Sequence, residues 1–292
     1  MERIRRARVA GSFYENSRKA LKEQIKNCFL HKVGPKKLPQ EESSDGLEKK
    51  ERKIIGVVSP HAGFMYSGPV AAHDYLALSY EKAPETIVIL GPNHSGLGED
   101  ISLMSEGFWE TPLGKVEIET ELAKNIIKND HHHIIKEDQK AHFLEHSIEV
   151  QLPFLQYIYS DRFTIIPISI KNQRIELMKY LAHILHDTVK DKLSLFIASS
   201  DFTHYESQQI AQQKDHEAIQ AITKEMNTDH FYETIKSNKA TICGPGPISV
   251  VMETCHLMGI KQGNLLKYAT SGEISGLYDQ VVGYASIIFK DS

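Results

Sequence analysis

Residues 54–63 read IIGVVSPHAG, an apolar run that ends abruptly at a turn carrying a histidine. Three other apolar runs end at polar residues, two of them at clusters with a histidine: residues 87–90 before GPNHS, residues 163–166 before Pro167, and residues 193–197 before SSDFTH. Short apolar runs without alternation are typical of strands buried on both faces of a sheet. We therefore predict four buried strands in an α/β fold.

The segments between these runs show helical spacing of apolar residues. We expect helices over residues 15–30, 67–80, 119–129, 146–159, 173–187, 207–226 and 247–258, and a last strand over 281–289. Ser67 is the expected N-cap of the second helix, and Pro153 should kink the fourth or mark its true start. This alternation favours a single domain over residues 1–292, with a mostly parallel central sheet flanked by helices. The charged, proline-containing segment 35–53 is expected to be a solvated insertion.

The composition is that of an ordinary globular protein, with 292 residues, 41% apolar and 25% charged residues. A formal net charge of −4 argues against a nucleic-acid partner, which would need a basic surface. No stretch approaches the roughly 20 apolar residues needed to cross a membrane, and the basic N-terminus lacks the apolar region of a secretory signal. Three cysteines form no disulfide framework, so we expect a cytoplasmic protein.

Polar side chains at the ends of the predicted strands are the first candidates for a functional site. His61, His94, and the pair Asp201 and His204 each follow a predicted strand. In open α/β sheets the binding crevice lies beyond the carboxyl ends of the strands, so these side chains should converge. Neutral imidazole is the commonest biological metal ligand, although a single loop histidine often only bonds to backbone. The pattern indicates a metal centre or an acid–base centre.

Cys243 lies immediately before the predicted helix 247–258, in the stretch TICGPGP. A helix N-terminus favours a thiolate, which suits a metal ligand or a nucleophile. The alternative is a small buried residue, the usual fate of a free cysteine, and this is what we expect of Cys28 and Cys255.

The remaining histidines and Asp201 have less specific signals. His204 could act as a general acid or base and Asp201 could orient an imidazole, although an aspartate there could also cap a helix. His146 begins a predicted helix and either reaches the crevice or lies on the surface. The run 131–133 (HHH) is expected to be a solvated loop, because consecutive side chains of an extended segment point in opposite directions. No Walker motif, dinucleotide fingerprint or nucleophile elbow is present.

Six motifs together resemble the Memo family, in family order from residue 8 to about residue 288. They are AGSFY at 10–14, PHAG at 60–63, GPNH at 91–94, EHSIE at 145–149, SDFTH at 200–204 and TICG at 241–244. The resemblance implies a fold like that of the class III extradiol dioxygenases of the LigB type, which are non-haem iron enzymes. It also implies that His61, His94 and Cys243 are metal ligands, with Asp201 and His204 lining the same pocket.

A thiolate ligand is softer than the carboxylate of the dioxygenases, which directs the site towards non-haem iron of altered reactivity or copper, with zinc as a further option. We therefore do not transfer catechol ring cleavage. The leading hypothesis is a metal-dependent oxidoreductase in which His204, Asp201 and His146 serve the chemistry. The alternatives are a non-catalytic adaptor module that binds a peptide or small anion, and a cysteine hydrolase using Cys243 with His204. The expected ligand is a small molecule or peptide. The family resemblance also implies a radical-SAM protein as a partner in the same pathway.

Overall fold

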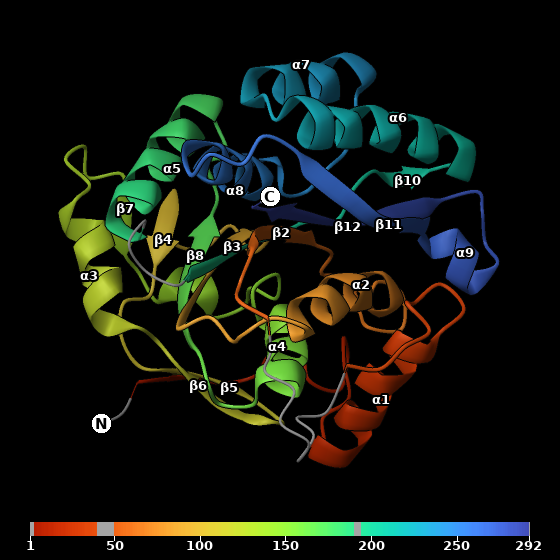
Figure 1. Ribbon diagram of the computed structural model, residues 1–292, viewed down its shortest axis with the longest axis horizontal. Helices are drawn as coiled ribbons and strands as arrows, with labels where there is room; N and C mark the ends of the chain where they lie inside the picture. The colour runs from red at the N-terminus through yellow and green to blue at the C-terminus, as the bar shows by residue number, and fades with distance from the viewer. Residues whose placement is uncertain (1–2, 40–49, 190–193, 292) are drawn as a thin grey trace.

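The computed structural model describes residues 3–39, 50–189 and 194–291, and its centre is one nine-stranded sheet (Figure 1). The strands of this sheet are β2 (Ile54–Ser59), β3 (Thr86–Pro92), β4 (Ile101–Leu103), β7 (Ile135–Glu137), β8 (Thr164–Ile170), β9 (Ser194–Ser199), β10 (His204–Glu206), β11 (Gly263–Thr270) and β12 (Val281–Lys290). Their order is β10-β12-β2-β9-β3-β8-β4-β7, and β11 pairs with β12. A separate small sheet contains β1 (Ile4–Arg5), β5 (Phe108–Thr111) and β6 (Gly114–Glu117).

The four apolar runs form the four adjacent central strands, as predicted. β2 pairs with β9, β9 with β3, and β3 with β8, all in parallel. Nearly all of their residues are buried, which explains why the runs do not alternate. Leu193, the first residue of the fourth run, lies outside the described residues.

The third run differs from its prediction, because β8 does not stop at Pro167 but continues to Ile170. Proline cannot donate a hydrogen bond to a sheet. Pro167 lies opposite Ile89 of β3, and the pairing of β8 with β4 on its other side begins only at Ile168. At Pro167, β8 is therefore paired with a neighbouring strand on one side only, so the missing N–H group leaves no partner strand without a hydrogen bond on the other side.

Antiparallel strands flank the parallel centre. β12 pairs in antiparallel fashion with β2, β10 and β11, and β4 does so with β8. The predicted α/β class with a central sheet flanked by helices is confirmed. β11 was not predicted from the sequence, because most of its residues are only half-buried and its apolar pattern is weak.

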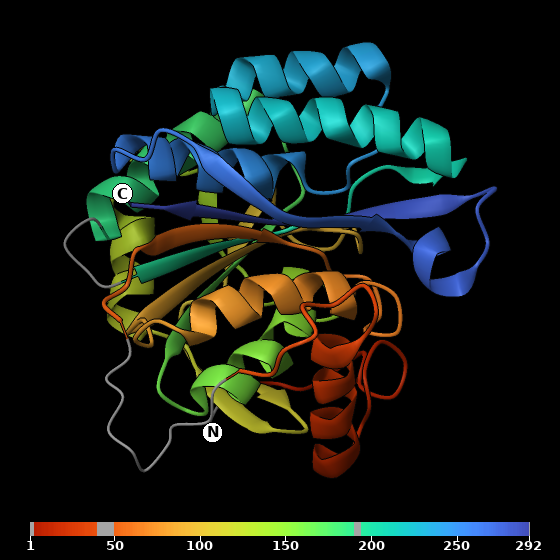
Figure 2. The same cartoon turned by 45° about the vertical axis from the view of Figure 1, so that its right-hand side comes forward.

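Helices cover both faces of the sheet. They are α1 (Arg18–Leu30), α2 (Gly68–Ser79), α3 (Thr120–Lys128), α4 (Leu152–Tyr159), α5 (Ile175–Val189), α6 (Gln208–Gln220), α7 (Thr228–Asn238), α8 (Pro245–Leu257) and α9 (Ser271–Ser275). Figure 2 shows α6, α7 and α8 above the sheet and α1, α2 and α4 below it. Among the described helices, none is both long enough and apolar enough to cross a membrane.

Seven of these helices match the predicted segments, with local differences at their ends. Pro153 marks the start of α4, which follows a 3₁₀ turn over Glu149–Gln151. Ser67 stands before α2, but its side chain does not cap the helix, contrary to the prediction. Its hydroxyl instead donates to the carbonyl oxygen of Ala62 at 2.7 Å. Of the predicted insertion 35–53, residues 40–49 lie outside the described residues.

Gly91, near the end of β3, allows Ser147 to approach the sheet closely. A Cβ atom at Gly91 would lie 2.3 Å from the Ser147 Oγ atom and 3.0 Å from a side-chain carbon of Ile148. Overpacking a buried site of this kind costs about 1–3 kcal/mol. We expect Gly91→Ala to lower the free energy of unfolding by about that amount in urea titrations. Gly63→Ala is the control, because its nearest neighbour would lie 3.5 Å away, and an equal loss there would contradict the argument.

Candidate metal centre

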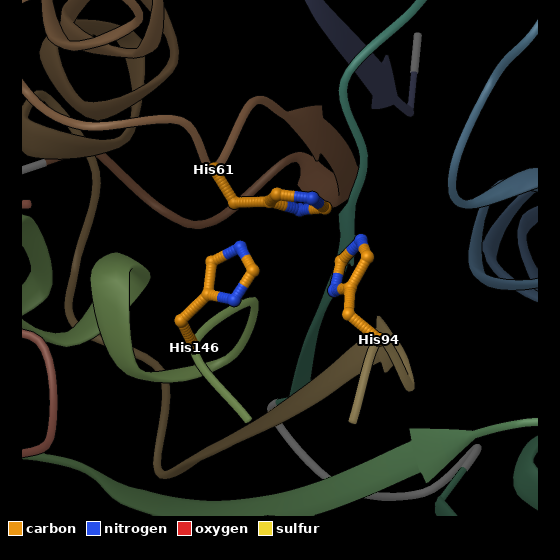
Figure 3. Close-up of side chains that lie close together, drawn as sticks. All are labelled: His61, His94 and His146. Atoms are coloured by element: carbon orange, nitrogen blue, oxygen red, sulfur yellow. The ribbon is translucent and has the colours of Figure 1, made fainter. Parts of the chain in front are cut away.

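Three histidine side chains from separate loops point towards one another beyond the carboxyl edge of the sheet (Figure 3). His61 follows β2, His94 follows β3, and His146 precedes α4. Each offers one ring nitrogen, and these three nitrogens all lie within 4.8 Å of one another. The rings of His94 and His146 stack with centroids 4.7 Å apart, while His61 meets both edge-on at 5.2 and 5.4 Å. We call these three residues the histidine cluster.

His61 is the most buried member of the histidine cluster, with 2% of its surface exposed. Its backbone N–H donates to Oδ1 of Asp201 at 2.8 Å, and its Nδ1 atom lies 2.9 Å from the hydroxyl of Ser199. Burial, followed by the neighbouring imidazoles, holds the pKa of His61 well below its ordinary value. The ring is therefore neutral at pH 7, the state in which imidazole binds metals.

His94 is oriented by a buried carboxylate, Glu145. The Nδ1 atom of His94 lies 2.9 Å from Oε1 of Glu145, and the same oxygen accepts the backbone N–H of Ser147 at 3.0 Å. Burial alone would raise the pKa of Glu145, but the hydrogen bond from His94 and the other donors hold it well below its ordinary value. Glu145 is thus ionised and can only accept, which places a hydrogen on Nδ1 of His94 and makes Nε2 the atom available to a metal.

His146 was predicted from the sequence as a catalytic residue, and the structure places it inside the histidine cluster. Its ring also lies against the ring of Phe13, with centroids 4.7 Å apart. Burial lowers the pKa of His146 to about 4, although the charge of Glu145 opposes the shift. The ring of His146 is therefore neutral at pH 7. It can bind a metal ion or take part in acid–base chemistry.

Cys243 lies beside the histidine cluster, just before α8, with its Sγ atom 3.2 Å from Nε2 of His61. The sulfur also accepts the backbone N–H of Asp201 at 3.2 Å. Burial and then the charge of Asp201 raise the pKa of the Cys243 thiol far above its ordinary range. In the metal-free protein burial therefore opposes the thiolate that a helix N-terminus is expected to favour. Cys28 and Cys255 are buried, as predicted.

Asp201 supports the His61 loop, and among the described residues no hydrogen bond joins it to the ring of His204. Its Oδ1 atom accepts the backbone N–H groups of His61 at 2.8 Å and Ala62 at 3.3 Å. Burial raises the pKa of Asp201 to about 6 against these hydrogen bonds. The ring of His204 is instead oriented by Thr241, whose carbonyl oxygen lies 2.9 Å from Nδ1. The expectation that Asp201 orients His204 is corrected accordingly, and Asp201 caps no helix, since α6 begins only at Gln208.

The N-terminal segment, residues 5–14, closes the base of the site through Glu149. This fully buried carboxylate pairs with Arg5 and accepts the Tyr14 hydroxyl at 2.5 Å and the backbone N–H of Val9 at 3.1 Å. The turn before Tyr14 places the ring of Phe13 against the ring of His146. The aromatic motif of residues 11–14 therefore supplies a ring that contacts the histidine cluster, from Phe13, and an anchor to the core, from Tyr14.

A cavity of about 440 Å³ is formed by residues that lie close along the chain to two members of the histidine cluster, although none of the cluster lines it. It is lined by Leu97, Gln139, Lys140 and Phe143, so that its walls lie three residues after His94 and three before His146. The run 131–133 is exposed, as predicted, and does not belong to the histidine cluster.

Comparisons with known proteins place these residues in context. A family model described as Memo-like protein matches residues 5–288. A MEMO1 family protein of Methanopyrus kandleri is 43% identical over 284 residues, which is 97% of this chain and 97% of that protein. A MEMO1 family protein of Saccharolobus islandicus is 44% identical over 284 residues, which is 96% of this chain and 97% of that protein.

Solved structures show a related fold at low sequence identity. An uncharacterized protein from Escherichia coli K12 aligns with a TM-score of 0.54 and 12% identity, covering 79% of this chain and 99% of that chain. At this identity the similarity concerns the fold alone.

Proposed function

This chain belongs to the Memo family, and from that premise we propose that it is a metal-dependent oxidoreductase whose ion is held by the histidine cluster. The observation that carries the proposal is the convergence of three imidazole nitrogens within 4.8 Å. Clusters of this kind suit iron, copper and zinc.

The donor set fits a transition-metal ion. The Nδ1 atoms of His61 and His94 are both tied to neighbouring side chains, which leaves their Nε2 atoms for the ion. Metal-bound histidines almost always have such an outer partner. His61 and His94 would be ligands in either arrangement, and the third would come from His146 or from the thiolate of Cys243.

We favour non-haem iron or copper, because the soft sulfur of Cys243 lies beside His61 and because the family resemblance points to oxygen chemistry. When bound, such an ion would supply electron transfer that zinc cannot. The chain itself would contribute proton transfer. Nδ1 of His204 is held by Thr241, so its Nε2 atom is left to exchange a proton, and Asp201, with a pKa of about 6, can hold one near neutrality.

The cysteine hydrolase alternative has less support. That chemistry needs a thiolate next to a protonated imidazole. Here burial favours the neutral thiol of Cys243 and the neutral ring of His61, and the ring of His204 is not bonded to Asp201. A cavity lined in part by Leu97 and Phe143, each three residues along the chain from a member of the histidine cluster, supports a small-molecule or short peptide substrate. We propose neither a nucleic acid nor a membrane as a partner of this chain.

Elemental analysis of protein purified without oxygen tests the proposal. We expect near-stoichiometric iron or copper in the unmodified protein. Loss of the ion in Cys243→Ser but not in His146→Ala would assign Cys243 as the third ligand, and the reverse result would assign His146. If no variant holds an ion even after Fe(II) or Cu(I) is added, the metal proposal is wrong and the pocket is better explained as a non-catalytic binding site.

The pH dependence of metal affinity gives an independent check on the third ligand. The thiol of Cys243 is protonated in the metal-free protein and must release its proton to bind an ion. Ligation by Cys243 should therefore raise the affinity about tenfold per pH unit between about pH 6 and 8. Ligation by His146, with its pKa of about 4, should leave the affinity flat over the same range.

A further inference from the structure

Ser199, the last residue of β9, lies at the centre of a closed set of buried hydrogen bonds. Its Oγ atom lies 2.6 Å from the carbonyl oxygen of Ser147, 2.7 Å from Nε2 of Gln151 and 2.9 Å from Nδ1 of His61. All four residues are buried, so water does not compete for these contacts. The sequence pattern of an apolar strand gave no indication of this role.

The direction of each hydrogen bond follows from which groups carry hydrogens. The carbonyl oxygen of Pro60 can only accept, so the Gln151 atom 3.1 Å from it is the amide nitrogen, and Tyr75 donates to the amide oxygen. Gln151 is therefore a donor to Ser199. The carbonyl of Ser147 also has no hydrogen to give, so the single hydroxyl hydrogen of Ser199 points at it.

With its hydrogen committed to Ser147, the hydroxyl of Ser199 can only accept from His61. The hydrogen of the His61 ring must then lie on Nδ1, and Nε2 is left with its lone pair. That nitrogen faces Cys243, whose Sγ atom is 3.2 Å away. Glu145 does the same for His94 with a carboxylate, so the two rings are fixed by two chemically different partners.

We propose that Ser199 is a positioning residue that holds His61 in the Nδ1–H tautomer and so presents Nε2 to the ion. This inference rests on the proposed metal centre, but the tautomer itself exists without an ion. Gln151 and Ser147 define the direction of the serine hydroxyl, and the hydroxyl defines the tautomer. Without Ser199 the ring can carry its hydrogen on Nε2, which blocks that atom as a ligand.

Anaerobic titration with Co²⁺, followed by its visible absorption, tests the consequence for binding. We expect Ser199→Ala to weaken Co²⁺ binding about 10–100-fold, the usual effect of removing an outer partner of a metal-bound histidine. Ser199→Thr keeps the hydroxyl and should restore the affinity. The matched control is Ser169→Ala on β8, because Ser169 is equally buried and its hydroxyl has no hydrogen-bond partner among the described residues.

Long-range ¹H–¹⁵N correlation spectra of the histidine rings in metal-free protein test the tautomer directly. The signals of His61 are assigned by their loss in His61→Gln. We expect the Nδ1–H form in the unmodified protein and a shift towards the Nε2–H form in Ser199→Ala. A folded Ser199→Ala protein that keeps the Nδ1–H form, or that binds Co²⁺ as tightly as the unmodified protein, overturns the inference. A tautomer change in a protein that never binds Co²⁺ supports the role of Ser199 and overturns the metal centre.

Discussion

His61→Ala is expected to weaken metal binding by more than about 100-fold, because removing a ligand should cost more than removing an outer partner, which costs about 10–100-fold. His61 contacts both candidates for the third ligand: its ring lies edge-on to His146, and its Nε2 atom is 3.2 Å from Cys243. The loss is therefore expected whichever of the two binds the ion. Anaerobic titration with Fe(II) or Cu(I), checked by elemental analysis, measures it.

His131→Ala provides the matched histidine control for this experiment. His131 is exposed in the loop 131–133 and lies outside the histidine cluster, so its removal should leave the metal content unchanged. Circular dichroism would show that both variants are folded. A folded His61→Ala protein that retains a full complement of metal would place the ion elsewhere and contradict the assignment.

Glu149→Gln is expected to lower the free energy of unfolding by about 3–5 kcal/mol. The side chains of Arg5 and Glu149 are 2% and 0% exposed, and removing the carboxylate charge leaves the guanidinium buried without compensation. The NH2 group of the amide would also face either the hydroxyl of Tyr14 or the guanidinium of Arg5, and both of these now donate to the carboxylate. Chemical denaturation followed by circular dichroism measures the change.

An exposed ion pair in the same part of the chain is the control for Glu149→Gln. Arg3 and Glu106 lie 3.1 Å apart with side chains 50% and 42% exposed. Such surface pairs contribute only about 0–1 kcal/mol, so Glu106→Gln should have little effect. Equal losses in the two variants would show that burial does not govern the energetics of the Arg5–Glu149 pair.

The central strands could be predicted because burial on both faces leaves an unbroken apolar run in the sequence. The same reasoning predicted that His61 and His94 lie at one edge of the sheet, and the structure places them there. It did not identify α7, because Thr228 and Phe231 are its only buried residues among the described ones, and so its apolar spacing is weak. Elements that bury little surface leave little pattern.

The outer partners of the histidine cluster could not be predicted for a different reason. Ser199 is 138 residues from His61 along the chain, and Glu145 is 51 residues from His94. A serine at the end of an apolar strand and a glutamate next to a histidine are ordinary local sequences. Their roles arise only from tertiary contacts, which also show that Thr241 and not Asp201 orients His204.

The attachment of the N-terminal segment has a consequence for the order in which the protein is made. Arg5 and Glu149 are 144 residues apart, and their pairing is one of the contacts that fix the segment to the core. At about 5–20 residues per second, Glu149 is added to the growing chain about 7–30 s after Arg5. Until then the segment lacks its buried partner carboxylate, so the contact of Phe13 with His146 is completed only after residues 145–149 have been made.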